Sequence, residues 1–169
     1  PILYIDFETR SECDLPKHGV HNYAQDLTTD VLCMCYAFDD GNVQTWTPDM
    51  PFPDNVRNFT GQIRAHNAAF DSRFWAVELG QLGITRDNPF LCTLRLARRV
   101  YPELPSHALQ ALRLALNLGS HGPAHRAQAD VDVTVALLKR IQSDLAERAG
   151  RPSVDADFLH RVQQAPRAR

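Results

Sequence analysis

Apolar residues in the first 66 positions fall into short runs separated by polar stretches, a pattern typical of β-strands. The longest runs are Ile2–Phe7 and Val31–Phe38. A turn sequence, Asp39-Asp40-Gly41-Asn42, joins the second run to Val43–Trp46 and predicts a β-hairpin. Ile63–His66 predicts a brief fourth strand.

The connections between these runs are polar and contain residues that break regular structure. Residues 9–29 include Pro16 and Gly19, and they predict a long irregular segment. Further prolines mark a loop before a weak helix, which we expect near Asp54–Phe59. The first third of the chain is therefore expected to hold strands that are joined by irregular segments.

From Ala69 onward the apolar residues recur at helical spacing. The expected elements are a helix from Ala69 to Gly83, a strand over Pro89–Cys92, a helix over Thr93–Val100, a helix capped by Ser106 that ends at Gly119, and a long helix from about Ala127. The apolar stripe of the long helix is expected to contain Val131, Val135, Leu138, Ile141, Leu145 and Ala149. This order predicts one α/β domain on a mixed sheet over residues 1–150. Residues 151–169 are expected to be a tail that forms a short helix or is partly disordered.

The composition agrees with a single globular domain. A chain of 169 residues with 44% hydrophobic residues can build one core, which excludes a disordered or fibrous protein. No run approaches the ~18 apolar residues of a membrane-spanning helix, and the first residues do not resemble a secretion signal. The four cysteines include no Cys-x2-Cys pair for zinc, and they favour a reducing, cytoplasmic setting.

The formal charge of −2 argues, taken alone, against a protein that is covered in positive charge to bind nucleic acid. The charge is unevenly distributed, however. Three basic and ten acidic residues give positions 1–60 a charge of −7, and fifteen basic and ten acidic residues give positions 61–169 a charge of +5. This asymmetry fits either an uneven scatter of surface charge or arginines that bind phosphate.

Four acidic residues occupy positions that suggest a metal site. Asp6 and Glu8 are two apart at the end of the first strand, so both side chains point to the same side. Asp71 falls on the buried stripe of its helix, and Asp130 begins the last helix beside its apolar stripe. Grouped carboxylates repel one another unless a cation neutralises them, and oxygen ligands suit Mg²⁺ or Mn²⁺. The ordinary alternatives are a solvated strand end and acids near helix N-termini.

His125 precedes the last helix in a segment that Gly122 and Pro123 predict to be a loop. A neutral histidine beside a metal site can take a proton from an attacking water. The alternative is that His125 is a surface histidine with no functional role. His121 and His125 also have His-x3-His spacing, but the glycine and proline between them argue against a helical zinc pair.

These residues lie in three motifs: Asp6-Phe7-Glu8-Thr9, His66-Asn67-Ala68-Ala69-Phe70-Asp71, and a His-x4-Asp from His125 to Asp130. In this order they resemble the DEDD exonuclease superfamily in its histidine branch, the DEDDh or DnaQ-like group, which includes the proofreading epsilon subunit of bacterial DNA polymerase III. The tyrosine branch would have Tyr where this chain has Arg126. The continuation Thr9-Arg10-Ser11 is more similar to the exonuclease portion of some phage-type DNA polymerases.

The resemblance implies a ribonuclease H-like fold, with a five-stranded mixed sheet flanked by helices. It implies that Asp6, Glu8 and Asp130 bind one divalent metal ion, and that Asp6 bridges to a second, which Asp71 holds directly or through water. The ions would be Mg²⁺, with Mn²⁺ able to substitute. His125 would be the general base.

The resemblance also suggests substrate contacts. Thr9 and Asn67 would touch the 3′-terminal nucleotide. His66 and Phe7 are further candidates for substrate binding, although the apolar neighbours of Phe7 favour a place in the core.

We therefore expect a metal-dependent 3′–5′ exonuclease that acts on nucleic acid with a free 3′ end and releases nucleoside 5′-monophosphates, with DNA as the favoured substrate. An RNA-directed exonuclease of the same family is one alternative. The other is an inactive module of this fold that binds nucleic acid or a polymerase. A DNA polymerase or another replication or repair protein is a candidate partner, and no membrane partner is expected.

Overall fold

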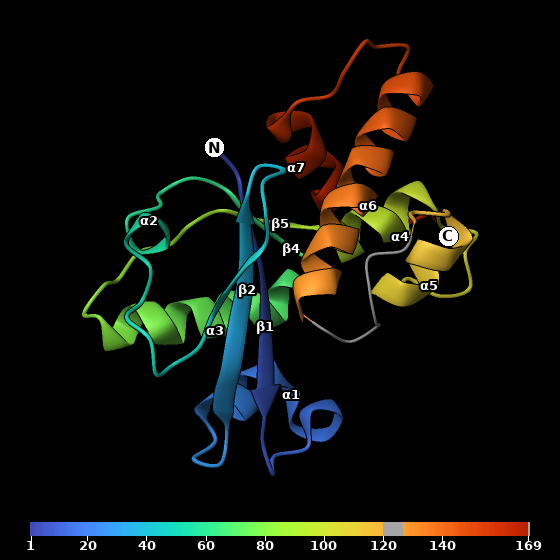
Figure 1. The fold of residues 1–169 in the computed structure, drawn as a ribbon. Coiled ribbons are helices and arrows are strands. Elements are labelled where there is room, and N and C mark those ends of the chain that lie inside the picture. The colour runs from blue at the N-terminus through green and yellow to red at the C-terminus, as the bar shows by residue number, and fades with distance from the viewer. Residues whose placement is uncertain (120–126, 169) are drawn as a thin grey trace.

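A five-stranded sheet forms the centre of the computed structural model, which describes residues 1–119 and 127–168 (Figure 1). The strands are β1 (Leu3–Arg10), β2 (Asp30–Phe38), β3 (Gln44–Trp46), β4 (Ile63–Ala65) and β5 (Phe90–Cys92). Their order is β3-β2-β1-β4-β5. β1 pairs antiparallel with β2 and parallel with β4, so the sheet is mixed, as the sequence predicts.

Helices cover both faces of the sheet. They are α1 (Leu15–Gln25), α2 (Asp54–Arg57), α3 (Ala68–Gln81), α4 (Thr93–Val100), α5 (Leu109–Ala115), α6 (Ala127–Arg148) and α7 (Ala156–Gln164). Leu3, Ile5 and Phe7 of β1 pack in the apolar cluster that contains α3, whereas Tyr4 packs in the cluster that contains α4 to α7. Alternate residues of β1 thus face opposite layers. No described helix is both long and apolar enough to cross a membrane.

The segment between β1 and β2 corrects one prediction, because it contains a helix rather than an irregular loop. The side chain of Asp14 caps α1 by accepting a hydrogen bond from the Lys17 N–H at 3.2 Å. Pro16 stands in the first turn, where its missing N–H breaks no helical bond. Gly19, with φ of 78°, is the residue inside α1 that has a non-helical backbone, and it kinks the helix there.

Two details of the later helices also differ from the predictions. Ser106 does not cap α5, which begins at Leu109 with Ala108 at the N-cap and no side-chain cap; the Ser106 hydroxyl accepts from the Ala108 N–H instead. The buried side of α6 is wider than one stripe, because this helix packs against β1, β2, α4 and α5 at once. Buried positions include Val131, Val133, Thr134, Leu137, Leu138 and Ile141, whereas Val135 and Leu145 are half-buried and Ala149 is exposed.

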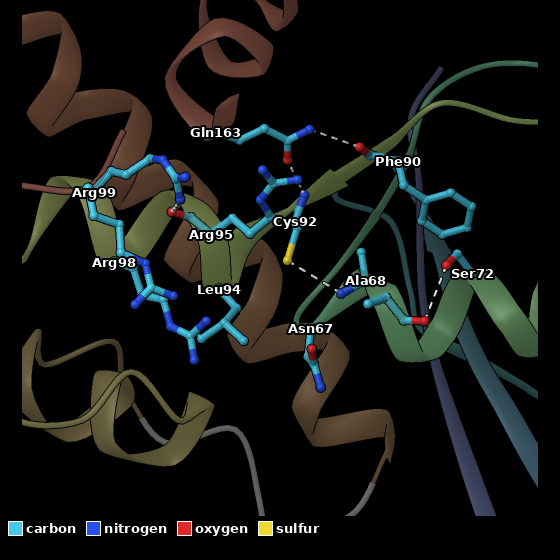
Figure 2. A pocket seen from close by; sticks show the side chains of 12 residues that line it. Asn67, Ala68, Ser72, Phe90, Cys92, Leu94, Arg95, Arg98, Arg99 and Gln163 are labelled. Carbon is cyan, nitrogen blue, oxygen red and sulfur yellow. Dashed lines mark hydrogen bonds between the residues drawn. The ribbon is translucent and has the colours of Figure 1, made fainter. Parts of the chain in front are cut away.

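The segment after Gly150 contains α7, which packs on α4 and β5. Leu159 is fully buried in the main cluster. The Gln163 side chain lies along the outer edge of β5, where it accepts from the Cys92 N–H at 2.8 Å and donates to the Phe90 carbonyl at 3.2 Å (Figure 2). One side chain thereby takes the place of a neighbouring strand.

Candidate active site

Three carboxylates meet where the second half of β1 faces the start of α6. Asp6 and Glu8 share the face of β1 that carries Tyr4, and this face is covered by α6 (Figure 1). Asp130 lies in the first turn of α6. One oxygen from each of Asp6, Glu8 and Asp130 lies within 4.8 Å of the other two, and all three residues are half-buried.

Asp71 reaches the same strand from the opposite layer. The pairing of β4 with β1 ends at Tyr4, so the Phe7 N–H beyond it has no strand partner on that side. Oδ1 of Asp71 accepts this N–H at 2.9 Å, and the side chain is 2% exposed. A buried carboxylate in α3 therefore substitutes for a strand at the point between Asp6 and Glu8.

Electrostatic repulsion links the four acids. Burial, and then the charges of Asp71, Glu8 and Asp130, raise the pKa of Asp6 to about 9. Burial raises the pKa of Asp71 to about 7, against the opposing effect of the Phe7 hydrogen bond. A cluster of oxygen donors that is costly to ionise without a cation fits Mg²⁺ or Mn²⁺ and does not fit a soft metal.

Gln110 of α5 is part of this site, although no sequence pattern indicates it. Its Nε2 donates to Oδ1 of Asp130 at 2.8 Å, and its Oε1 accepts from Nε of Arg113 at 2.9 Å. A metal ligand held by a second polar residue keeps its orientation. α5 therefore helps to fix the Asp130 carboxylate.

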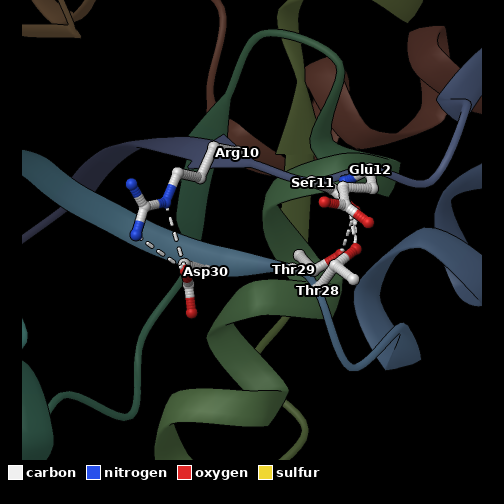
Figure 3. A network of polar contacts seen from close by, with 6 residues as sticks. All are labelled: Arg10, Ser11, Glu12, Thr28, Thr29 and Asp30. Carbon is white, nitrogen blue, oxygen red and sulfur yellow. Dashed lines mark hydrogen bonds and ion pairs between the residues drawn. The ribbon is translucent and has the colours of Figure 1, made fainter.

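Polar contacts fix the end of β1 just beyond Glu8 (Figure 3). The pairing of β1 with β2 shifts register between Glu8 and Thr9, which leaves Leu32 of β2 without an opposite residue. Past this bulge, Arg10 forms an ion pair with Asp30 at 3.0 Å. Hydroxyl and backbone contacts complete the network, and they join Ser11 and Glu12 to Thr28 and Thr29.

The four predicted substrate-binding residues have different surroundings. The Thr9 hydroxyl is hydrogen-bonded to the Tyr23 hydroxyl at 2.9 Å, which holds β1 to α1. Phe7 is buried and packs on Phe74, so its ring belongs to the core, as its apolar neighbours suggest. Asn67 is exposed and precedes α3 with a left-handed backbone, at φ of 64°; asparagine adopts this conformation more readily than most residues.

His66 connects elements within the protein. Its Nδ1 lies 2.9 Å from the Thr93 hydroxyl, and its Nε2 lies 3.0 Å from the His107 carbonyl. Burial, together with the nearby charge of Arg98, lowers the pKa of His66 to about 4, so the ring is neutral. Because a carbonyl can only accept, the proton sits on Nε2 and Nδ1 accepts from Thr93. Both ring nitrogens are thus engaged inside the fold.

His125, the predicted general base, and His121 lie outside the described residues.

Comparisons with known proteins agree with this architecture. The RNase_T family model, described as an exonuclease, matches residues 54–138. A Mycobacterium tuberculosis protein named "Putative bifunctional exonuclease/endonuclease protein" is 39% identical over 164 residues, 91% of this chain and 23% of that protein. The PolC-type DNA polymerase III of Latilactobacillus sakei is 36% identical over 97 residues, 54% of this chain and 6% of the polymerase. The chain therefore spans a small part of both relatives.

A solved structure shows the same fold. Exonuclease X, in complex with 5′-overhanging duplex DNA, superposes with a TM-score of 0.60 at 21% identity, covering 96% of this chain and 99% of that one. The mixed five-stranded sheet with its flanking helices is thus ribonuclease H-like, as expected. Together with the family model and the mycobacterial relative, this shows that the chain belongs to the DnaQ-like exonuclease family.

Proposed function

We propose that the chain is a metal-dependent 3′–5′ exonuclease that removes nucleoside 5′-monophosphates from DNA. The observation that carries this proposal is the convergence of Asp6, Glu8 and Asp130, whose oxygens lie within 4.8 Å of one another at a half-buried strand end. An inactive binding module would have no need for such a cluster, because grouped carboxylates destabilise a fold without a cation.

The relatives favour DNA as the substrate. Several of them are PolC-type DNA polymerases, among them those of Bacillus cereus and Clostridium perfringens, at 37% and 42% identity over 87 and 77 residues. These proteins are many times longer than this chain, so they support DNA as the substrate only through family resemblance. RNA is the alternative substrate, which the assay below distinguishes.

In this proposal, Asp6, Glu8 and Asp130 hold one divalent ion, and Asp6 and Asp71 hold a second. Bound ions of this kind activate water and neutralise charge that develops on a phosphodiester. The chain's own contribution is to hold the ligands in place: the Phe7 N–H orients Asp71, and Gln110 orients Asp130. His125, which the sequence motif alone supports, would accept the proton of the attacking water.

A labelled-oligonucleotide assay tests the function. Matched DNA and RNA strands with a 5′ label, single-stranded and duplex, are incubated with Mg²⁺, with Mn²⁺ or with a chelator. We expect a ladder of shortened labelled DNA that requires metal and that a 3′-phosphate slows. Loss of the label as a mononucleotide from the 5′ end would contradict the polarity, and faster degradation of RNA would contradict the substrate.

Two site variants and one control variant test the site assignment. Asp6→Asn should abolish hydrolysis, whereas Asp87→Asn, a matched change of an exposed acid, should leave it intact. His125→Gln should lower kcat while the apparent Mg²⁺ affinity stays close to that of the wild type. Full activity of Asp6→Asn would show that the metal site lies elsewhere, and a wild-type rate for His125→Gln would remove this residue as the base.

A further inference from the structure

A second concave site, rich in arginine, lies next to the N-terminus of α3. It is a cavity of about 510 Å³ between α3, β5, α4 and the segment after α7. Arg95, Arg98 and Arg99 of α4 line it together with Arg167, and Asn67 lies at its opposite side. Figure 2 shows the labelled arginine side chains of α4 on one side of the cavity and Asn67 on the other.

The positive charge of this cavity is not balanced by acids. Among residues 1–119 and 127–168, no carboxylate lies within salt-bridge distance of these four arginines. Burial and then the charges of Arg95 and Arg167 lower the pKa of Arg99, which shows that the guanidinium groups repel one another. Arg99 is held in place by backbone carbonyls, since it donates to Ala165 and to Arg95. An anion would relieve this repulsion.

Asn67, which lines the cavity, shows how near the cavity lies to the carboxylate site. Asn67 lies four residues before Asp71 in sequence, which corresponds to about 6 Å of helix rise. A strand whose terminal phosphodiester lies at Asp6 and Asp71 therefore has the arginine cavity within a few nucleotides. Guanidinium groups bind phosphate oxygens in pairs, and such phosphate contacts carry no sequence information. Phe90 is the one aromatic residue among the described lining residues.

We propose that this arginine cavity binds backbone phosphates of the substrate strand, a few nucleotides upstream of its 3′ end. The proposal rests on the proposed exonuclease function. It adds a length preference: the enzyme should favour strands that are long enough to reach the cavity over dinucleotides, without regard to sequence. Uncompensated arginines in the basic part of an otherwise acidic chain also explain how a protein with a net charge of −2 holds a polyanion.

The test compares a double variant, Arg95→Gln with Arg167→Gln, against Arg57→Gln. Arg95 and Arg167 are exposed, and their side chains have no hydrogen-bond partner among the described residues, so their loss should not disturb folding. Arg57 is an exposed arginine on α2, outside the cavity, and its loss removes one positive charge, half of the change in the double variant. Thermal melting of each variant verifies that it is folded.

Binding is measured by fluorescence anisotropy with a labelled ten-nucleotide DNA strand in a chelator, so that no hydrolysis is needed. For single strands, log K falls with log salt by about 0.7 for each phosphate contact. The double variant should lower the magnitude of this slope by about 1.4 and weaken binding equally for different sequences. Arg57→Gln should reproduce the wild-type slope, and an unchanged slope in the double variant would overturn the proposal.

Hydrolysis gives the second measurement, namely kcat/KM for the ten-nucleotide strand divided by kcat/KM for a dinucleotide. We expect this ratio to fall about tenfold in the double variant and to keep its wild-type value in Arg57→Gln. A ratio that falls only with duplex substrates would place the complementary strand in the cavity and refute the proposal as stated. Salt-dependent binding by a wild type that hydrolyses nothing would refute the proposed function while leaving the cavity's role intact.

Discussion

Asp71 should make the metal-free protein less stable than a neutral side chain would, and the penalty should depend on pH. Its carboxyl is 2% exposed, and burial raises its pKa from 3.8 to about 7. A shift of about 3 units corresponds to about 4 kcal/mol of destabilisation once the group is ionised. Asp71→Asn keeps an oxygen that can accept the Phe7 N–H but carries no charge. It should therefore recover up to about 4 kcal/mol in a chelator.

The direction of the pH dependence of stability follows from the number of protons that the folded and unfolded chains bind. Between pH 3.8 and about 7, the folded chain keeps the Asp71 proton while the unfolded chain has lost it. The contribution of Asp71 to the free energy of unfolding of the wild type therefore falls as pH rises through this window and levels off above it. The advantage of Asp71→Asn should be near zero at about pH 4 and largest above about pH 7.

Urea unfolding in a chelator across this pH range measures the difference. Asp87→Asn, an exposed control, should change stability by less than about 0.5 kcal/mol at every pH. A stability difference between Asp71→Asn and the wild type that does not grow with pH would refute the penalty assigned to the buried Asp71 carboxylate. So would a variant that is less stable than the wild type at pH 8.

Three further outcomes follow from the structure. Gln163→Leu should cost about 2–4 kcal/mol in urea unfolding, because it leaves the buried Cys92 N–H and the Phe90 carbonyl without partners; a loss below about 1 kcal/mol would contradict this role. Mg²⁺ binding should release protons and tighten as pH rises toward 9, because the pKa of Asp6 is about 9 without metal; calorimetry in buffers of different ionisation enthalpy measures the release. Gln110→Leu should weaken the apparent Mg²⁺ affinity about tenfold in titrations of activity, because Asp130 loses its hydrogen bond; an unchanged affinity would exclude this positioning role.

The sequence predicts the strands and most helices because their signals are local. Apolar runs locate β1 and β2, and Thr93–Val100 forms a helix with the predicted bounds. The sequence does not indicate α1, because Pro16 and Gly19 are residue types that usually break helices, whereas here one starts the helix and the other only kinks it. The periodicity of α6 indicates one buried stripe, but the elements packed on several sides of the helix bury a wider surface.

The residues of the candidate site are likewise only partly predictable from local sequence signals. Spacing alone places Asp6 and Glu8 on one face of a strand, and a motif links them to Asp130. No local signal reveals that Asp71 accepts from Phe7, because that contact depends on where the pairing of β4 with β1 ends. Gln110 and Gln163 likewise act through partners 20 and more residues away, which only the folded chain brings together.

Gln163, at the edge of β5, affects both the deuterium exchange of a backbone amide and the pairing of this sheet with strands of other molecules. The Cys92 amide lies on an outer strand of only three residues, where rapid deuterium exchange would be the ordinary behaviour. Because Gln163 covers it, this proton can exchange only when α7 detaches, so its protection reports the docking of the last helix. The same cover denies a foreign strand the open backbone groups from which sheets grow between molecules.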